Sequence, residues 1–187
     1  MPNWCNTTMV CTGEGAKKLL SIIESCEKKE LHKSDFGNLW LGNIVIAMGL
    51  EWEKIFCRGS ITSYEYDDSN ETPELSIDYD SAWNPCYELM GAIRRMFNVE
   101  LIYISEEPGC DLFRTNDPGM EKCTLVEYEN EETGEYLHED LLPNEIRKFC
   151  RDVSGGICRT LEELDEWCRR QPDAALYYYA YEYFDDF

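Results

Sequence analysis

Two carboxylates on one predicted strand are the clearest candidates for catalytic chemistry in this chain. Between residues 74 and 80, apolar and polar side chains alternate as in a strand with one buried face. Asp78 and Asp80 share the polar face near Glu74, and a metal-dependent hydrolase or nuclease needs neighbouring carboxylates to hold a divalent cation. A strand with one solvated face gives the same pattern, so a hydrolase using Asp78 and Asp80 is the alternative function and not the leading one.

The other groups that commonly act as bases or nucleophiles form no recognisable site. His32 and His138 are the only histidines, and each stands beside polar or charged residues that predict a surface position. The chain has no P-loop and no glycine-rich dinucleotide motif. The acidic run 67–71 lacks the glycine that a calcium loop requires at its sixth position. We therefore expect a protein without catalytic residues, metal, cofactor or small-molecule substrate.

Ten cysteines are spread almost evenly along the chain. Secreted domains held by disulfides are shorter and denser in cysteine, and zinc sites favour close pairs, whereas this chain has no C-x-x-C. The loose spacing of Cys150, Cys158 and Cys168 is only a weak metal pattern. We expect reduced thiols that pack as small hydrophobic side chains. A Cys–His nucleophile pair stays open, because the sequence singles out no one cysteine.

The net charge limits the choice of partner more than any motif does. The 38 Asp and Glu residues against 17 Lys and Arg give a net charge of −21. A globule of this length is about 40 Å across, and duplex DNA of that length carries about two dozen negative charges. Direct binding to nucleic acid is therefore disfavoured, and attraction to basic, nucleic-acid-handling proteins is favoured. The alternative interpretation is that the acidic surface serves only to keep the protein soluble.

Three acidic segments are the candidate contacts for such a partner. The segment from Glu127 to Glu132 is the strongest, because it places four acids close together with no base. The predicted contact residues are Asp67, Asp68, Glu71, Glu127, Glu129, Glu131, Glu132, Asp185 and Asp186.

Length and composition predict a folded α+β protein. The 187 residues are 43% hydrophobic and 13% aromatic, which is enough to form a core. Period-two alternation and turn residues predict strands over 7–12, 59–66, 74–80, 99–104, 123–128 and 135–137. Helical spacing of apolar residues predicts helices over 16–29, 39–50, 86–97, 143–153 and 161–170. Asn84 and Pro85 are typical of a helix start, as N-cap and first helical residue. The tyrosine-rich tail 176–187 predicts an edge strand, whose exposed face is also suited to a protein interface.

The order of these elements predicts a ferredoxin-like fold. Residues 1–115 run strand, helix, strand, strand, helix, strand, with a helical insertion after the first helix. This is the βαββαβ arrangement, in which two helices cover one face of an antiparallel sheet. Residues 116–187 form a C-terminal α/β extension packed on that domain, and we expect the two parts to be one continuous unit.

Three short motifs resemble the YubB ferredoxin-like domain family. They are Met1-Pro2-Asn3-Trp4-Cys5-Asn6, then Ser81-Ala82-Trp83-Asn84-Pro85, then Glu107-Pro108-Gly109. The match covers roughly residues 1–115 and departs at Cys86, where the family often has a second proline. The resemblance implies the ferredoxin-like fold and carriage by plasmids, phages and other mobile elements. It implies no activity and no catalytic residues.

The leading hypothesis is therefore a non-catalytic acidic inhibitor encoded by a phage or plasmid. Its carboxylates would occupy the nucleic-acid groove of a host defence effector, giving a DNA-mimic-like anti-CRISPR or anti-restriction protein. No run of about 18 apolar residues and no basic and apolar leader is present, so we expect no membrane contact and a cytoplasmic location. An acidic patch would favour the inhibitor, converging carboxylates in a hollow the hydrolase, and evenly scattered charge an accessory protein.

Overall fold

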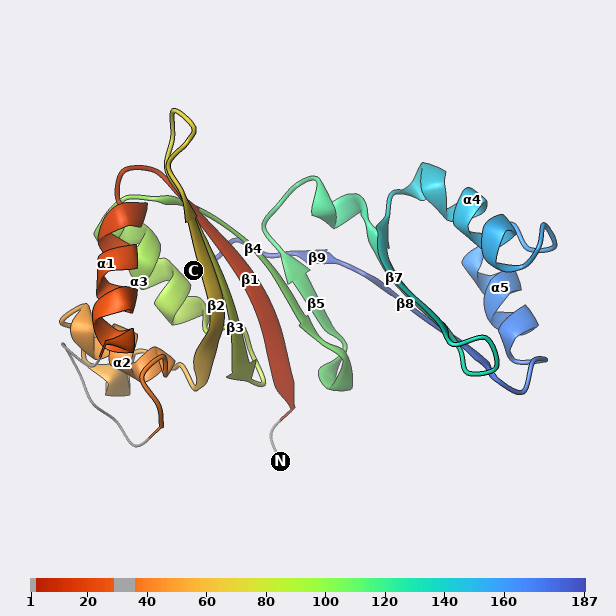
Figure 1. Cartoon of the computed structure of the whole chain (residues 1–187), viewed down its shortest axis with the longest axis horizontal. Coiled ribbons are helices and arrows are strands. Elements are labelled where there is room, and N and C mark those ends of the chain that lie inside the picture. The colour runs from red at the N-terminus through yellow and green to blue at the C-terminus, as the bar shows by residue number, and fades with distance from the viewer. Residues whose placement is uncertain (1–2, 29–35) are drawn as a thin grey trace. The chain divides into compact units, whose positions relative to one another are not determined.

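The computed structural model describes residues 3–28 and 36–187, which form two compact units (Figure 1). The first unit comprises Met1–Asn116 together with Phe184–Phe187, and the second comprises Asp117–Tyr183. The second unit is therefore inserted in the chain between the bulk of the first unit and its last four residues. The expected boundary at 115/116 lies one residue from the observed one, but the return of the tail was not foreseen.

The first unit contains six long elements in the expected order, and several shorter ones. Its strands are β1 (Trp4–Thr12), β2 (Gly59–Asp67), β3 (Glu74–Ala82), β4 (Glu100–Glu107) and β5 (Leu112–Thr115). Its α-helices are α1 (Ala16–Glu27), α2 (Leu41–Ala47) and α3 (Tyr87–Phe97), and short 3-10 helices cover Trp52–Lys54 and Pro108–Cys110. The two-residue strand β9 (Glu182–Tyr183), where the chain returns to this unit, is the last strand of its sheet.

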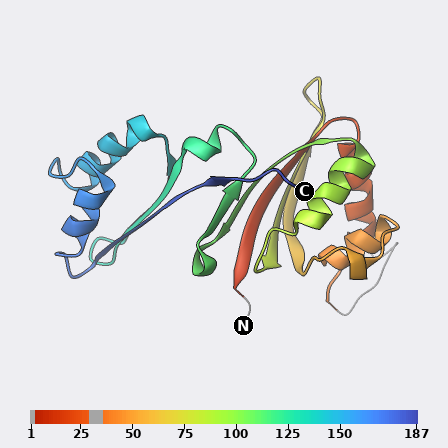
Figure 2. The ribbon, with the colours of Figure 1, turned by 180° about the vertical axis from the view of Figure 1, so that it is seen from behind.

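The strands of this sheet lie in the order β2-β3-β1-β4-β5-β9. The neighbouring pairs from β2 to β5 are all antiparallel. Helices α1, α2 and α3 lie on one side of the sheet, as the views from front and back both show (Figures 1 and 2).

The core of the first unit fills the space between its helices and one face of its sheet. Leu19 and Ile23 are fully buried and recur at helical spacing, so they form one face of α1. Ile77 and Tyr79 are buried in the same core, because alternate side chains of β3 point toward the helices. The intervening polar side chains, such as that of Asp78, lie on the opposite face of the sheet.

The second unit is a three-stranded sheet with two helices. Its elements are a 3-10 turn (Met120–Lys122), β6 (Thr124–Asn130), β7 (Glu135–Leu141), α4 (Pro143–Val153), α5 (Leu161–Cys168) and β8 (Ala174–Ala180). The strand order is β7-β6-β8 with both pairs antiparallel, so β8 is an edge strand, as the alternation of the tail predicts. Val126 and Tyr128 of β6 are buried against residues of the helices, among them Cys150 and Leu164.

The structure confirms the α+β class and corrects two local predictions. The strand β5 was not predicted, because its four residues show no alternation. Helix α3 begins at Tyr87, not at Pro85, and its N-cap is Cys86 in a left-handed conformation. Asn84 is therefore not the N-cap, although its Oδ1 accepts a hydrogen bond from the backbone N–H of Cys86 at 2.8 Å.

His32 lies outside the described residues. None of the described helices is long and apolar enough to cross a bilayer.

Candidate functional site

The described strands of this protein hold acids but almost no bases. They carry 14 Asp and Glu side chains and a single base, Arg114, while the other 14 Lys and Arg of the described residues lie outside them. The carboxylates are those of Glu65, Asp67, Glu74, Asp78, Asp80, Glu100, Glu106, Glu107, Glu127, Glu129, Glu135, Glu139, Asp140 and Glu182. Acids thus occur both on and off the strands, whereas the described bases lie almost entirely in helices, turns and loops.

The second unit shows this separation most clearly. Between Asp117 and Tyr183 there are 17 acidic and 7 basic residues, a net charge of −10. Six of the seven bases lie between residues 147 and 170, which form the helical segment. The hairpin of β6 and β7 has seven acids between residues 124 and 141 and no Lys or Arg. The unit therefore has a mixed helical layer and an acidic sheet layer.

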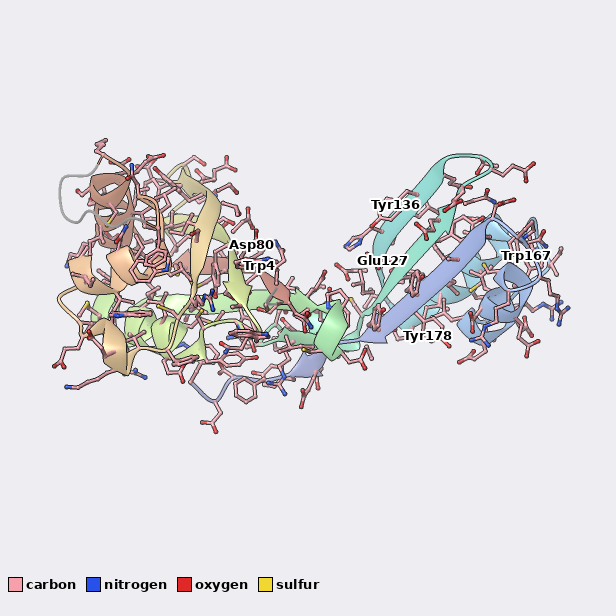
Figure 3. The ribbon with its side chains drawn as sticks, turned by 90° about the horizontal axis from the view of Figure 1, so that it is seen from below. Trp4, Asp80, Glu127, Tyr136, Trp167 and Tyr178 are labelled. Carbon is pink, nitrogen blue, oxygen red and sulfur yellow. The ribbon has the colours of Figure 1, made fainter. Side chains whose placement is uncertain are left out.

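The face of this sheet opposite the helices combines carboxylates with tyrosines. Glu127 of β6 stands opposite His138 of β7 and Tyr177 of β8 in the strand register. The carboxylate of Glu127 accepts a hydrogen bond from the hydroxyl of Tyr136 at 3.3 Å and lies 3.1 Å from Nδ1 of His138. Figure 3 shows Glu127 and Tyr136 on neighbouring strands, with Trp167 on helix α5. Tyr136 is 61% exposed and Tyr177 is 50% exposed, so this face offers aromatic rings beside its acids.

The predicted contact residues fall into three groups in the structure. Asp67, at the end of β2, starts the β2–β3 turn that contains Asp68 and Glu71, and all three are exposed. Hydrogen bonds from Ser69 lower the pKa of Asp67, so it stays ionised. Glu127 and Glu129 lie on β6, and Glu131 and Glu132 are exposed in the turn that follows it. The last pair is Asp185 and Asp186, in the tail that belongs to the first unit.

Asp185 is held inside the first unit instead of facing a partner freely. Its Oδ1 accepts hydrogen bonds from Arg94 at 2.8 Å and from Asn116 at 2.9 Å. Phe184 and Phe187 on either side contact the ring of Tyr87, with ring centroids 4.7 and 6.0 Å away. Both aspartates are exposed, and they differ in that the Asp186 side chain makes no such hydrogen bond with the described residues. Asp185 therefore fixes the tail in place, and Asp186 is the member of this pair that is free to meet a partner.

The carboxylates of Asp78 and Asp80 are used within the sheet. Asp78 accepts hydrogen bonds from the hydroxyls of Thr8 at 2.7 Å and Ser63 at 2.6 Å, one on each oxygen. Asp80 accepts one from the side-chain amide of Asn6 at 3.1 Å. Within residues 3–28 and 36–187, no three side chains of His, Cys, Asp or Glu are grouped to hold a metal ion. These contacts account for both carboxylates as acceptors on the polar face of the sheet.

The thiols are poorly suited to nucleophilic chemistry. All ten cysteines are free, and only Cys110 is exposed. Burial raises the pKa of the Cys5, Cys11 and Cys57 thiols to about 12, far above the range in which a thiolate forms at neutral pH. A hydrogen bond with Glu107 raises the pKa of Cys110 itself. Burial also raises the pKa of the Cys150 and Cys168 thiols to about 11.

The three motifs that carry the family resemblance meet at one end of the first unit's sheet. The backbone N–H of Trp83 donates to the carbonyl of Asn3 at 3.0 Å, and the side-chain amide of Asn3 lies 3.4 Å from the thiol of Cys110. The carboxylate of Glu107 accepts from the backbone N–H of Gly109 at 3.1 Å. Glu107 is only 2% exposed, and its other oxygen has no hydrogen-bond partner among the described residues. This buried acid was not predicted, because the apolar side chains on both faces of residues 101–104 leave the buried face undecided.

Sequence reasoning also missed a tryptophan-rich pocket beside these motifs. A cavity of about 390 Å³ is lined by the segment from Trp52 to Arg58 and by the turn from Ala82 to Cys86. Trp83 and Cys86 both have left-handed backbone conformations, with φ of 67° and 60°. Non-glycine residues adopt this conformation at a cost, and such residues cluster at functional sites. The available signal was the number of tryptophans, but their positions in the chain are far apart.

Comparisons with known proteins add no family to this description. Neither the scan of protein-family models nor the search of curated proteins gives a match for this chain. The resemblance to the YubB family therefore rests on its three motifs and stays a prediction.

Proposed function

We infer that this protein is a non-catalytic acidic binding protein, whose strand carboxylates engage a basic, nucleic-acid-handling protein. The observation that carries the proposal is the near absence of bases from the described strands, which hold 14 acids and only one base. A surface that served solubility alone would have no reason to separate the charges by layer. The hydrolase alternative draws no support from Asp78 and Asp80, whose oxygens accept hydrogen bonds from neighbouring side chains.

The physical basis is electrostatic attraction between the acidic strands and a partner's nucleic-acid groove. A groove lined by Lys and Arg attracts any surface that concentrates negative charge, and such attraction raises the association rate. The tyrosines on the outer face of the second unit's sheet, Tyr136 and Tyr177, would supply the apolar area that carboxylates lack. The carboxylates would raise the association rate and orient the partner, and the aromatic rings would add binding affinity.

The finer fold and the biological setting belong to the same proposal. A ferredoxin-like arrangement of the first unit is supported by the antiparallel strand order β2-β3-β1-β4, with α1 following β1 and α3 following β3. With the mobile-element setting that the family resemblance implies, the partner would be a cytoplasmic defence effector. The protein would then act as an anti-CRISPR or anti-restriction inhibitor with DNA-mimic-like charge.

The direct test is competition with duplex DNA. Purified CRISPR nucleases and restriction endonucleases would be loaded with fluorescent duplex, and the protein would be titrated in while fluorescence anisotropy is followed. We expect displacement of the DNA from at least one such enzyme, weakening as salt shortens the Debye length from about 10 Å at 0.1 M.

A charge control separates specific binding from general polyanion binding. Poly-glutamate, matched to this protein in total charge, should displace DNA from the same enzyme far less well. Equal displacement by poly-glutamate would mean that charge alone acts, and no displacement from any enzyme at low salt would contradict the proposal.

A further inference from the structure

The tryptophan-rich pocket of the first unit continues into a second hollow. The two have volumes of about 390 and 320 Å³, and Trp52 and Arg58 line both. Trp4 and Trp40 line the second hollow, and Trp83 lines the first. Four of the five tryptophans of the chain therefore line these two adjoining hollows, which we together call the tryptophan-rich depression.

The rings around this depression are exposed to a degree that is unusual for aromatic side chains. Trp4 is 55% exposed, Phe56 is 69% exposed and Trp83 is 49% exposed. Large contiguous apolar patches on soluble proteins mark interaction sites, and tryptophan with arginine is the typical composition of binding hot spots. The exposure of these rings indicates a surface that another molecule covers.

The depression is a built feature of the fold. The indole of Trp40 lies directly on Gly42, where a Cβ would come within 2.2 Å of the ring. Only glycine leaves room for this stacking. The ring of Trp40 in turn lies 4.9 Å from that of Trp52, measured between centroids. The ring of Trp52, which lines both hollows, is thus packed against the ring of Trp40.

Arg58 and the indoles of the tryptophans supply hydrogen-bond donors at this site. The guanidinium of Arg58 lies 5.8 Å from the centroid of the Trp83 ring and forms no ion pair with the described residues. A guanidinium offers five N–H donors and an indole offers one, and neither accepts. A polyproline II segment has no internal hydrogen bonds, so its carbonyls need donors, and its proline rings pack on flat aromatic walls.

The charge around the depression favours a basic occupant. The first unit has 21 acidic and 10 basic residues, a net charge of −11. Glu53 lines the larger hollow itself. Nucleotides and other anionic ligands are disfavoured by this field, whereas Lys and Arg residues of a peptide are attracted by it.

We propose that the two hollows bind an extended, proline-containing segment of a partner protein that carries Lys or Arg beside its prolines. Its prolines pack against Trp52 and Trp83, and its carbonyls accept hydrogen bonds from Arg58. The proposal does not rest on the acidic strands, because the residues that line the hollows are separate from the strand carboxylates that the proposed function uses.

The test is a titration of the full-length protein with designed peptides, followed by tryptophan fluorescence and calorimetry. The first peptide carries spaced prolines with lysines between them, the second has alanines in place of the prolines, and the third has glutamates in place of the lysines. We expect the first to bind, the second to bind about tenfold more weakly or worse, and the third not to bind. Equal binding of the first two peptides would overturn the proposal, and so would binding of the third.

Two variants locate the site. Trp83→Asn keeps a residue that tolerates the left-handed backbone, and Phe56→Ser changes a ring that is already 69% exposed. Both should weaken the first peptide about tenfold. Ile157→Ser, at a position 68% exposed in the second unit, is the matched control and should bind as the wild type does. Wild-type binding by both pocket variants would overturn the proposal. Peptide binding by a protein that displaces no DNA would leave this site standing while the proposed function fails.

Discussion

Asp185 and Asp186 are adjacent residues of one type, and the structure assigns them different roles. Asp185 accepts hydrogen bonds from Arg94 and Asn116, whereas the Asp186 side chain makes no such bond with the described residues. Replacing Asp185 by alanine should therefore destabilise the first unit, and the same change at Asp186 should not. The pair is a matched experiment, because both variants remove one carboxylate from the same four-residue tail.

The expected magnitude follows from the contacts of Asp185. A hydrogen bond to a charged group contributes about 1.5–3 kcal/mol when buried, but the Asp185 side chain is 37% exposed, so solvent screens the pair. We expect a loss of about 1–2 kcal/mol for Asp185→Ala, or about 3–8 °C in Tm, and less than about 0.5 kcal/mol for Asp186→Ala. Arg94→Ala combined with Asp185→Ala should show a coupling of about 0.5–1 kcal/mol.

The assay is urea unfolding followed by tryptophan fluorescence at two pH values. Burial raises the pKa of Asp185, but the hydrogen bonds from Asn116 and Arg94 outweigh it and hold the pKa below its ordinary value of 3.8. Its contribution is therefore present at neutral pH and lost as the pH falls below 3.8. The difference between wild type and Asp185→Asn should shrink in that acid range. Equal stabilities of the Asp185→Ala and Asp186→Ala proteins at pH 7 would refute this reasoning.

Three further predictions test other parts of the structure. Asp78→Ala should lower the free energy of unfolding by about 1–2 kcal/mol through its lost hydrogen bonds with Thr8 and Ser63; a Mn²⁺ site seen by calorimetry in the wild type and lost in this variant would instead support the hydrolase. Ellman's reagent at pH 8 should modify the exposed Cys110 first and the buried thiols only on unfolding, since burial raises the pKa of most of them; rapid reaction of several thiols in the folded protein would argue against this. Asn84→Ala should cost about 1 kcal/mol in urea unfolding, because the Oδ1 of Asn84 accepts a hydrogen bond from the backbone N–H of Cys86, while Asn84→Asp keeps the acceptor and should cost less.

The regular elements could be predicted because their side chains repeat at the period of the backbone. The alternation from Glu74 to Asp80 fixes β3 and its buried face, and the spacing of Leu19 and Ile23 fixes the inner face of α1. The two strands of the acidic hairpin β6–β7 were also predicted from the sequence. Its carboxylates were candidates from the sequence because one short segment places them together without a base.

What could not be predicted depends on contacts that no periodicity of the sequence reveals. Asn84 and Pro85 carry the local signal of a helix start, but the hydroxyl of Ser81 donates to the carbonyl of Asn84 at 2.6 Å and that of Tyr79 donates to the carbonyl of Pro85. These bonds hold the turn outside the helix, which starts at Tyr87. These side-chain hydrogen bonds to the backbone thus override the helix-start preference of Asn84 and Pro85.

The tail and the tryptophan-rich depression were missed for the same reason. No periodicity of the sequence predicts that the chain returns to the first unit at Phe184. There the backbone N–H of Phe184 donates to the carbonyl of Thr115 at 2.8 Å. Trp4 and Trp83 are separated by most of the first unit in sequence, and only the pairing of β1 with β3 brings them to the same end of the sheet.

The account depends most on the claim that the acidic hairpin of β6 and β7, and not the net charge, meets the partner. Two triple variants test it: Glu129, Glu131 and Glu132 to Lys at the end of β6 and in the turn after it, and Asp152, Glu162 and Glu166 to Lys in the helical layer. Each changes the net charge from −21 to −15, and all six side chains are exposed. The measurement is the association rate with a nuclease from which the wild type displaces DNA, over a range of salt. We predict that the first variant slows association and flattens its salt dependence far more than the second. Equal slowing by both variants, with both folds intact by circular dichroism, would contradict the claim.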